Sequence, residues 1–165
     1  MQTIIVETQI AAPPERCFLL SLSIDLHVQS TAPTREQAIA GVTHGLIGPG
    51  QTETWEGRHF GLKLRHRSRI TKYEKPDHFQ DVMVKGLFRS FEHDHYFEAT
   101  PNGTVMRDVQ HFAAPFGLLG LIAEVFVLKR YLRRFLIQRN RAIRKIAEGS
   151  AEVRQKFLDR GVSGR

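Results

Sequence analysis

The stretch 62–70 reads LKLRHRSRI and decides the kind of fold that the rest of the chain can build. Alternation of apolar and charged residues over this length is typical of a strand with one buried face. The even-numbered positions form the face toward the interior or a cavity, and they are Leu62, Leu64, His66, Ser68 and Ile70. The odd-numbered positions form a solvated row of cations, which are Lys63, Arg65, Arg67 and Arg69. The strand therefore belongs to an antiparallel sheet that is covered on one side.

The same period of two continues on both sides of this strand, from about residue 35 to residue 113. Turn signals interrupt it at 48–50 (GPG), 60–61 (FG), 75–77 (KPD), 85–86 (KG) and 101–103 (PNG). This pattern predicts an antiparallel meander of about six strands. Upstream, residues 3–10 form a first strand, Pro14 begins a short helix, and Asp25 is expected to cap a second short helix that runs to Gln29.

After the meander the period changes to 3.6, which predicts one long amphipathic helix over 118–146. Its apolar stripe consists of Leu118, Leu121, Ile122, Val125, Leu128, Leu132, Phe135, Leu136, Ile143 and Ile146. Its cations fall largely outside that stripe. Gly149 is expected to end the helix. We predict one domain over residues 1–148 and a short helical or frayed tail over 149–165.

Composition limits the class of protein. The chain has 165 residues, 24 Lys and Arg against 17 Asp and Glu, and 41% hydrophobic residues, which excludes a disordered chain. Its one cysteine, Cys17, excludes an internal disulfide framework and is expected in the core. The N-terminus lacks a signal-peptide pattern, and the apolar run 116–127 is shorter than the roughly 20 residues of a membrane span. We expect a soluble, basic, cytoplasmic domain.

A strand, two short helices, a curved antiparallel sheet and one long C-terminal helix make a compact α+β layout. A curved sheet that closes on one helix leaves a space between them, and function is expected in that space. The order resembles the helix-grip fold of the SRPBCC superfamily, which includes START, polyketide cyclase and birch-pollen-allergen proteins. The segments that carry the resemblance are 10–15 (IAAPPE) with Phe18, Trp55 with 58–61 (RHFG), 68–71 (SRIT), 75–81 (KPDHFQD), 91–97 (FEHDHYF), 104–108 (TVMRD) and 115–120 (PFGLLG).

The resemblance covers nearly the whole chain, to about residue 148. It implies a curved antiparallel sheet wrapped around the C-terminal helix, as in a bacterial subfamily of ligand-binding proteins. The superfamily hosts lipid carriers, cyclases, hydrolase-like enzymes and binding modules, so the resemblance fixes the fold more firmly than the function.

The turns also predict which residues face one another inside the sheet. The loop 100–103 sets Phe97 opposite Met106, His95 opposite Asp108, His93 opposite Gln110 and Phe91 opposite Phe112. A loop centred on Leu87 sets His93 opposite Asp81, His95 opposite Phe79 and Phe91 opposite Met83. The turn at 60–61 sets Trp55 opposite His66 and His59 opposite Leu62, with an outward pair of Glu56 and Arg65.

The inward face is then mostly apolar but contains a polar group of residues: His59, His66, Asp81, His93, His95, Asp108 and Gln110. An unpaired buried carboxylate costs several kcal/mol, so Asp81 and Asp108 are expected to pair with the histidines at 93 and 95. Oriented polar groups in an apolar wall are the usual make-up of a small-molecule site.

We therefore predict that the protein binds a hydrophobic or aromatic small molecule, such as a lipid or a polyketide-like metabolite, between the sheet and the long helix. The predicted walls are Trp55, Phe79, Met83, Phe91, Phe97, Met106, Phe112, Leu121, Val125, Leu128 and Leu132. The polar residues named above are predicted to hold the polar end of the molecule. We predict no cofactor and no metal, and the oligomeric state stays open.

Three alternatives remain open at this point. The pair His95 and Asp108 could act as acid and base in a cyclase-like or hydrolase-like reaction, although no nucleophile motif supports it. The spacing of His93 and His95 suits some metal sites but is a weak signal. The basic exterior could contact an anionic membrane surface transiently, whereas nucleic-acid binding is disfavoured because no aromatic residues alternate with the cations. His27, His44 and His78 are expected at the surface.

Overall fold

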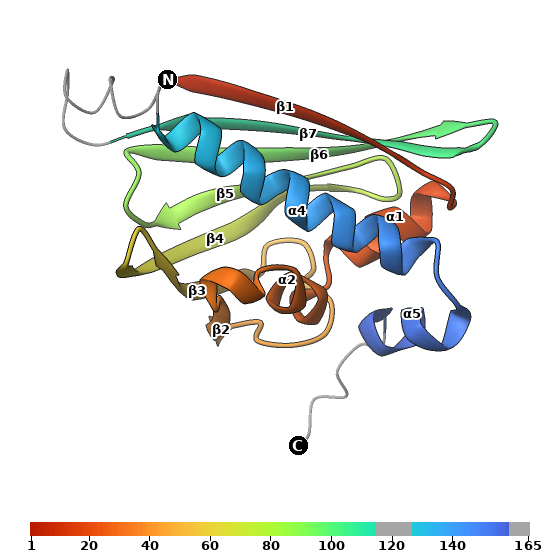
Figure 1. The fold of residues 1–165 in the computed structure, drawn as a ribbon, viewed down its shortest axis with the longest axis horizontal. Coiled ribbons are helices and arrows are strands. Elements are labelled where there is room, and N and C mark those ends of the chain that lie inside the picture. Colours follow the sequence, from red (N-terminus) through yellow and green to blue (C-terminus); the bar gives the residue numbers. More distant parts are fainter. Residues whose placement is uncertain (115–126, 159–165) are drawn as a thin grey trace.

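Seven antiparallel strands form one sheet in the order β1-β7-β6-β5-β4-β3-β2 in the computed structural model, which describes residues 1–114 and 127–158 (Figure 1). The strands are β1 (Gln2–Ile10), β2 (Gln37–Gly41), β3 (Thr52–His59), β4 (Leu62–Glu74), β5 (His78–Lys85), β6 (Ser90–Thr100) and β7 (Gly103–Ala113). The helices are α1 (Pro14–Ser21), α2 (Ile24–Ser30), the short 3₁₀ turn η1 (Ala32–Thr34), α4 (Lys129–Ala147) and α5 (Ala151–Leu158). The predicted order of elements is confirmed.

Helix α4 lies across one face of the sheet and packs against β1, α1 and α2 (Figure 1). Its buried residues are Leu136, Arg139, Asn140, Ile143, Ile146 and Ala147, which repeat at helical spacing. Its exposed cations are Arg130, Arg133, Arg134, Arg141, Arg144 and Lys145. The part of the predicted helix over 118–126, with Leu121 and Val125, lies outside the described residues. Among residues 1–114 and 127–158, no helix is long and apolar enough to cross a membrane.

The registers predicted from the turns are confirmed for the three central hairpins. His93 faces Gln110 and His95 faces Asp108 across β6 and β7, Asp81 faces His93 across β5 and β6, and Trp55 faces His66 across β3 and β4. The predicted pair of Phe91 with Met83 is not formed, because the β5–β6 ladder ends at Val82 and Glu92. Leu62, expected to face inward, is 63% exposed at the end of the β3–β4 hairpin.

The two short helices follow the predicted boundaries closely. Pro14 is the first residue of α1, as expected from its fixed φ and missing amide hydrogen. The cap of α2 differs from the prediction, because the side chain of Ser23 accepts a hydrogen bond from the Leu26 amide. Asp25 instead accepts a hydrogen bond from the Gly45 amide, at 2.7 Å, and so ties α2 to the loop before β3.

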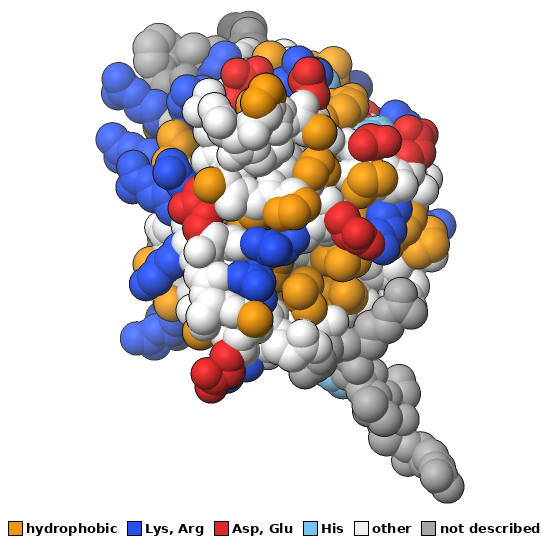
Figure 2. Space-filling model, turned by 90° about the vertical axis from the view of Figure 1, so that its right-hand side faces the viewer, with side chains coloured by type: hydrophobic (Ala, Val, Ile, Leu, Met, Phe, Trp, Pro, Cys, Tyr) orange, Lys and Arg blue, Asp and Glu red, His pale blue; other side chains and the backbone are white. Residues whose placement is uncertain are grey.

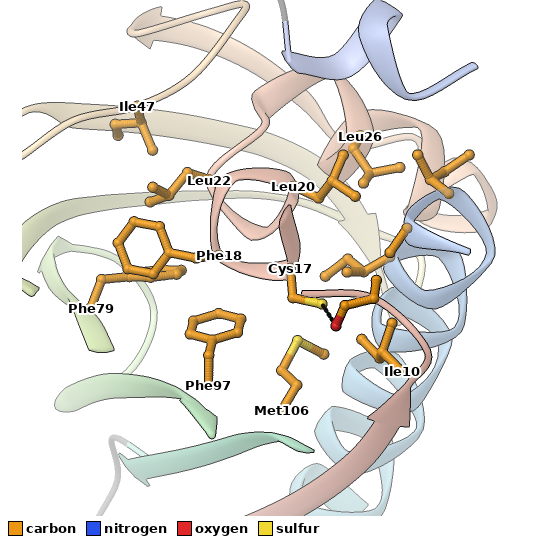
Figure 3. Close-up of a cluster of buried hydrophobic side chains, with 14 of the residues drawn as sticks. Ile10, Cys17, Phe18, Leu20, Leu22, Leu26, Ile47, Phe79, Phe97 and Met106 are labelled. Atoms are coloured by element: carbon orange, nitrogen blue, oxygen red, sulfur yellow. Dashed lines mark hydrogen bonds between the residues drawn. The ribbon is translucent and has the colours of Figure 1, made fainter. Parts of the chain in front are cut away.

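The hydrophobic core lies where α1 and α2 meet the sheet and α4 (Figure 3). Phe18 on α1 is fully buried, and its ring packs edge-on against Phe79 and Phe97 at centroid distances of 5.4 and 5.5 Å. Cys17 is buried beside it, as predicted, and Met106 has no exposed surface. Each buried side chain of this size contributes about 2–3 kcal/mol to folding. Helix α1 thus fills one end of the space that the sheet encloses.

Helix α5 continues the chain after Gly149 and turns back along the body of the protein. Its partly buried residues Phe157 and Leu158 pack against the core cluster that contains Phe18. The first part of the predicted tail is therefore helical and in contact with the domain.

Candidate functional site

A cavity of about 200 Å³ lies between the inner face of the sheet and α4. Eleven of the residues predicted to contact a ligand line it: Trp55, His59, His66, Phe79, Asp81, Phe91, His93, His95, Gln110, Leu128 and Leu132. They come from strands β3 to β7 and from the start of α4 and the turn before it. The inward alternation of the strands therefore brings residues far apart in the sequence to one wall.

Five other residues predicted for this site do not line the cavity. Phe97 and Met106 belong to the packed core beneath Phe18, and Phe112 and Met83 belong to a second cluster around Leu136. Asp108 lies behind two histidines and is fully buried. The strand register gives the face of each residue correctly, but Phe18 of α1 packs against Phe97, and Leu136 of α4 belongs to the same cluster as Phe112 and Met83.

Asp81, His93, His95 and Asp108 form one connected group, which we call the histidine–aspartate cluster. His93 Nε2 lies 3.0 Å from Asp108 Oδ1, and His95 Nε2 lies 3.1 Å from Asp81 Oδ1. His95 Nδ1 lies 2.8 Å from Asp108 Oδ1, so both ring nitrogens of His95 face carboxylates. The predicted pairing of the two aspartates with the two histidines is confirmed.

The cluster separates the pKa values of its members. Burial raises the pKa of Asp81, but the hydrogen bond with His95 and the charges of both histidines prevail and lower it to about 2. Burial and the charge of His95 lower the pKa of His93, whereas Asp108 and Asp81 raise the pKa of His95 against the effect of burial. The two carboxylates thus favour the charged form of His95, whose Nε2 is engaged with Asp81.

Comparison with known proteins gives a fold and no closer relationship. No family model matches the chain, and no curated protein matches it. The solved protein TTHA0849 of Thermus thermophilus superposes with a TM-score of 0.68 at 15% identity, over 86% of this chain and 97% of that chain. Major latex-like protein 151 of Panax ginseng gives a TM-score of 0.67 at 16% identity, over 90% of this chain and 98% of that chain.

The di-domain ARO/CYC protein StfQ of the steffimycin biosynthetic pathway is also similar. It gives a TM-score of 0.65 at 15% identity, over 88% of this chain and 50% of that chain. The chain has the helix-grip fold. The resemblance inferred from the sequence is therefore confirmed at the level of the fold, which many different functions share.

Around the helix-grip cavity, the structure adds a second polar group that the sequence reasoning missed. Glu36, just before β2, lies between two imidazoles: its Oε2 is 2.7 Å from His27 Nε2 and its Oε1 is 2.9 Å from His59 Nε2. His59 Nδ1 lies 2.6 Å from the hydroxyl of Tyr131 on α4. We call these four residues the Glu36 cluster. All four line the cavity.

The expectation that His27 lies at the surface is therefore wrong. Its ring stacks on Trp55 at a centroid distance of 4.0 Å, and its side chain is 19% exposed. The expectation is also wrong for His78, which is buried on the opposite face of the sheet with Asp94, 2.8 Å away. His44 is exposed, as predicted. The pairing of β2 with β3 would have located Glu36, but the bulge between Ala38 and Ala40 conceals that register in the sequence.

Three further lining residues carry a buried polar atom with no hydrogen-bond partner among the described residues. They are Glu53 with its Oε2, Gln110 with its Oε1 and Arg139 with its Nη1. The other carboxylate oxygen of Glu53 accepts a hydrogen bond from Ser68, at 2.6 Å. Burial and the charge of Asp81 raise the pKa of Glu53 to about 7. The alternation that places Trp55 inward also places Glu53 inward, so this residue could have been found from the sequence.

The outer face of the helix-grip sheet carries the predicted row of cations. Lys63, Arg65, Arg67 and Arg69 are exposed, and the first two form ion pairs with Glu56 at 2.6 and 2.8 Å. Another view of the molecule shows Lys and Arg side chains gathered along one edge (Figure 2). Exposed pairs of this kind contribute at most about 1 kcal/mol each, so the row describes the surface charge more than the stability.

Proposed function

We propose that the protein binds a compact hydrophobic or aromatic molecule, lipid or polyketide-like in character, in the cavity beneath α4. The aromatic and aliphatic lining supplies the apolar contacts, from Trp55, Phe79 and Phe91 on the strands and from Leu132 and Phe135 on α4. The likeness to an ARO/CYC protein of a biosynthetic pathway supports this interpretation at the level of the fold.

The observation that carries the proposal is the set of unpartnered polar atoms in an apolar wall. Glu53 Oε2, Gln110 Oε1 and Arg139 Nη1 are buried without a hydrogen-bond partner in the described part of the chain, and their residues line one cavity. Leaving a buried polar group unpaired costs about 1–3 kcal/mol. A ligand whose polar end carries hydrogen-bonding groups removes that cost, as a water molecule also would. These three residues would therefore orient the polar end of the ligand.

The volume of about 200 Å³ limits the size of the ligand. It suits a small fused-ring molecule better than a long acyl chain, because a bound ligand must fit inside the space that the side chains leave. The unpartnered atoms are two acceptor oxygens, of Glu53 and Gln110, and one donor nitrogen, of Arg139. A ligand with hydroxyl groups at one end fits this wall best, because a hydroxyl can donate to the two oxygens and accept from the guanidinium.

The first test is native mass spectrometry of freshly purified protein, compared with the mass of the denatured chain. We expect a noncovalent organic adduct on the folded protein, or saturable binding of the naphthalene dye ANS at one molecule per chain after extraction with solvent. Absence of both would overturn the proposal.

A pair of matched variants locates the bound molecule. Leu132→Trp places a larger ring in the cavity from α4, whereas Arg134→Trp adds the same ring at an exposed position of the same helix. We expect Leu132→Trp to weaken ANS binding at least tenfold and Arg134→Trp to leave it unchanged. Equal affinities of the two variants would place the dye outside the cavity and contradict the proposal.

A second candidate function is acid–base catalysis, and Glu53 favours it. A carboxyl with a pKa of about 7 and one unpartnered oxygen in a cavity can take up and release a proton near neutral pH. His95 and Asp108 fit this role less well, because Asp108 does not line the cavity. Hydrolysis of p-nitrophenyl acetate with a rate that inflects near pH 7, and loses that inflection in Glu53→Gln, would support an enzyme.

A further inference from the structure

Three of the residues that line the cavity bring metal-ligand atoms close together. Asp81, His93 and His95 each offer one ligand atom, and these atoms all lie within 4.8 Å of one another. Asp81 Oδ1 lies 3.8 Å from His93 Nδ1 and 3.1 Å from His95 Nε2. In a tetrahedral site with metal–ligand bonds near 2.1 Å, neighbouring ligand atoms are about 3.4 Å apart. The two observed distances lie on either side of that value.

The far side of His93 is already held by a hydrogen bond, as metal-bound histidines require, and the same carboxylate faces the far side of His95. His93 Nε2 and His95 Nδ1 lie 3.0 and 2.8 Å from the same oxygen of Asp108. The other oxygen of Asp108 accepts a hydrogen bond from Asn140 on α4, at 2.7 Å. A carboxylate behind a metal-bound imidazole fixes the orientation and tautomer of the ring and makes it a better ligand. Asp108 would do this for His93 through its hydrogen bond, and its charge also lies close to the far nitrogen of His95.

The Glu36 cluster also combines two imidazoles with a carboxylate but does not have this arrangement. Its two imidazoles contact different oxygens of Glu36, so the carboxylate separates them. In the histidine–aspartate cluster, by contrast, both imidazoles approach the same oxygen of Asp81. The two clusters therefore differ in how the carboxylate meets the imidazoles, and only the second has another carboxylate behind them.

We propose that Asp81, His93 and His95 form a binding site for one divalent transition-metal ion of the zinc type, with a further coordination position open to the cavity. Two imidazoles and one carboxylate suit Zn²⁺ and its neighbours in the series, and they suit Ca²⁺ or Mg²⁺ poorly. All three ligands line the cavity, so a ligand oxygen can complete the coordination. The ion takes the place of the proton between His95 Nε2 and Asp81 Oδ1.

The site does not depend on the proposed organic ligand, because its three ligands and its supporting carboxylate all belong to the chain. The test therefore uses the metal alone. Metal-free full-length protein is titrated with Co²⁺, and the visible absorption of four- or five-coordinate cobalt reports binding; Zn²⁺ is then added as a competitor. We expect one Co²⁺ per chain, displaced by Zn²⁺.

The variants separate this site from adventitious binding at other histidines. We expect His93→Gln and His95→Gln to weaken Co²⁺ binding at least a hundredfold, and Asp108→Asn to weaken it ten- to a hundredfold through loss of the orienting contacts. His78→Gln is the matched control, because it also breaks a buried His–Asp pair of the same sheet, and it should bind Co²⁺ as the wild type does. Circular dichroism confirms that each variant is folded.

Should either histidine variant fail to fold, Asp81→Asn gives the same information, because its side chain is 17% exposed at the cavity wall. No stoichiometric cobalt spectrum, or the same affinity in Asp81→Asn and the wild type, would overturn the metal site. The ANS titration is independent of this result. Cobalt binding with neither an organic adduct nor dye binding would overturn the proposed function and keep the metal site. Dye binding without cobalt binding would overturn the metal site and keep the proposed function.

Discussion

Glu36 and Glu53 are buried carboxylates on the same cavity wall, yet their environments move their pKa values in opposite directions. Burial raises the pKa of both. Glu36 accepts hydrogen bonds from His27 and His59, which outweigh burial and lower its pKa to about 2. Glu53 accepts one hydrogen bond from Ser68 and faces the charge of Asp81, so burial prevails and its pKa rises to about 7.

The difference shows that partners, and not depth, decide what a buried carboxylate does in this cavity. The side chains of Glu36 and Glu53 are similarly inaccessible, at 8% and 5% exposure of the whole residue. Glu36 is a permanent anion that ties α2, β3 and α4 together through its histidines and Tyr131. Glu53 gains or loses a proton near neutral pH, which suits a group that meets a ligand.

The largest effect is expected from Glu36→Gln. A folded-state pKa of about 2 against 4.5 corresponds to about 3 kcal/mol of stability at neutral pH. Because the folded pKa is lowered, this contribution is present above pH 4.5 and is lost as the pH falls toward 2. Urea denaturation should show the variant less stable by about 3 kcal/mol at pH 7, with the gap closing in acid.

Glu56→Gln is the control for this change, because Glu56 is a carboxylate on the opposite face of β3 with two cationic partners. It should lose much less stability than Glu36→Gln. A variant of Glu36 that keeps the full acid dependence of the wild type would show that its two histidine contacts do not hold its charge.

An effect of similar size and opposite sign is expected from Glu53→Gln at alkaline pH. Since the folded pKa is raised, the contribution of Glu53 to stability is complete below pH 4.5 and is lost as the pH rises through about 7. At pH 8 the variant should therefore be more stable than the wild type by about 3 kcal/mol, because the amide carries no charge to bury. At pH 4.5 the two should be equal.

Urea denaturation with EDTA present, at these two pH values, checks this expectation without interference from metal ions. Equal stability at pH 8 would mean that Glu53 is ionised at little cost, and the contrast with Glu36 would fail. It would also remove the observation that favours acid–base catalysis.

The sequence predicts one part of this cavity well. Short turns fix the register of neighbouring strands, and this register predicts the cross-strand partners of His93, His95, Asp81 and Trp55. A slip by one residue would expose a whole row of aromatic side chains, so the register is well determined. The same alternation extended by one step from Trp55 reaches Glu53. These are residues whose place is determined by their own strand.

The other part depends on elements that local periodicity does not position. His27 comes from α2 and Tyr131 and Arg139 from α4, and on a helix a polar residue near the edge of the apolar stripe has the pattern of a solvated one. Likewise, the register places Phe97 and Met106 on the inner face but cannot show that Phe18 fills the space above them. The boundary between core and cavity is set by packing of helices on the sheet.

The smallest expected effect is that of Tyr131→Phe, and it sharpens the comparison by testing how far the Glu36 cluster extends. The Tyr131 hydroxyl lies 2.6 Å from His59 Nδ1, and the opposite nitrogen of that ring contacts Glu36. Loss of one hydrogen bond of this kind should lower the free energy of unfolding by about 1 kcal/mol. A rise in the acid midpoint of unfolding, measured by circular dichroism, should accompany it, because a less firmly held His59 stabilises the Glu36 anion less. If only the stability at pH 7 falls and the acid midpoint stays, Tyr131 packs against the cluster without taking part in it, and the anion is held by its two histidines alone.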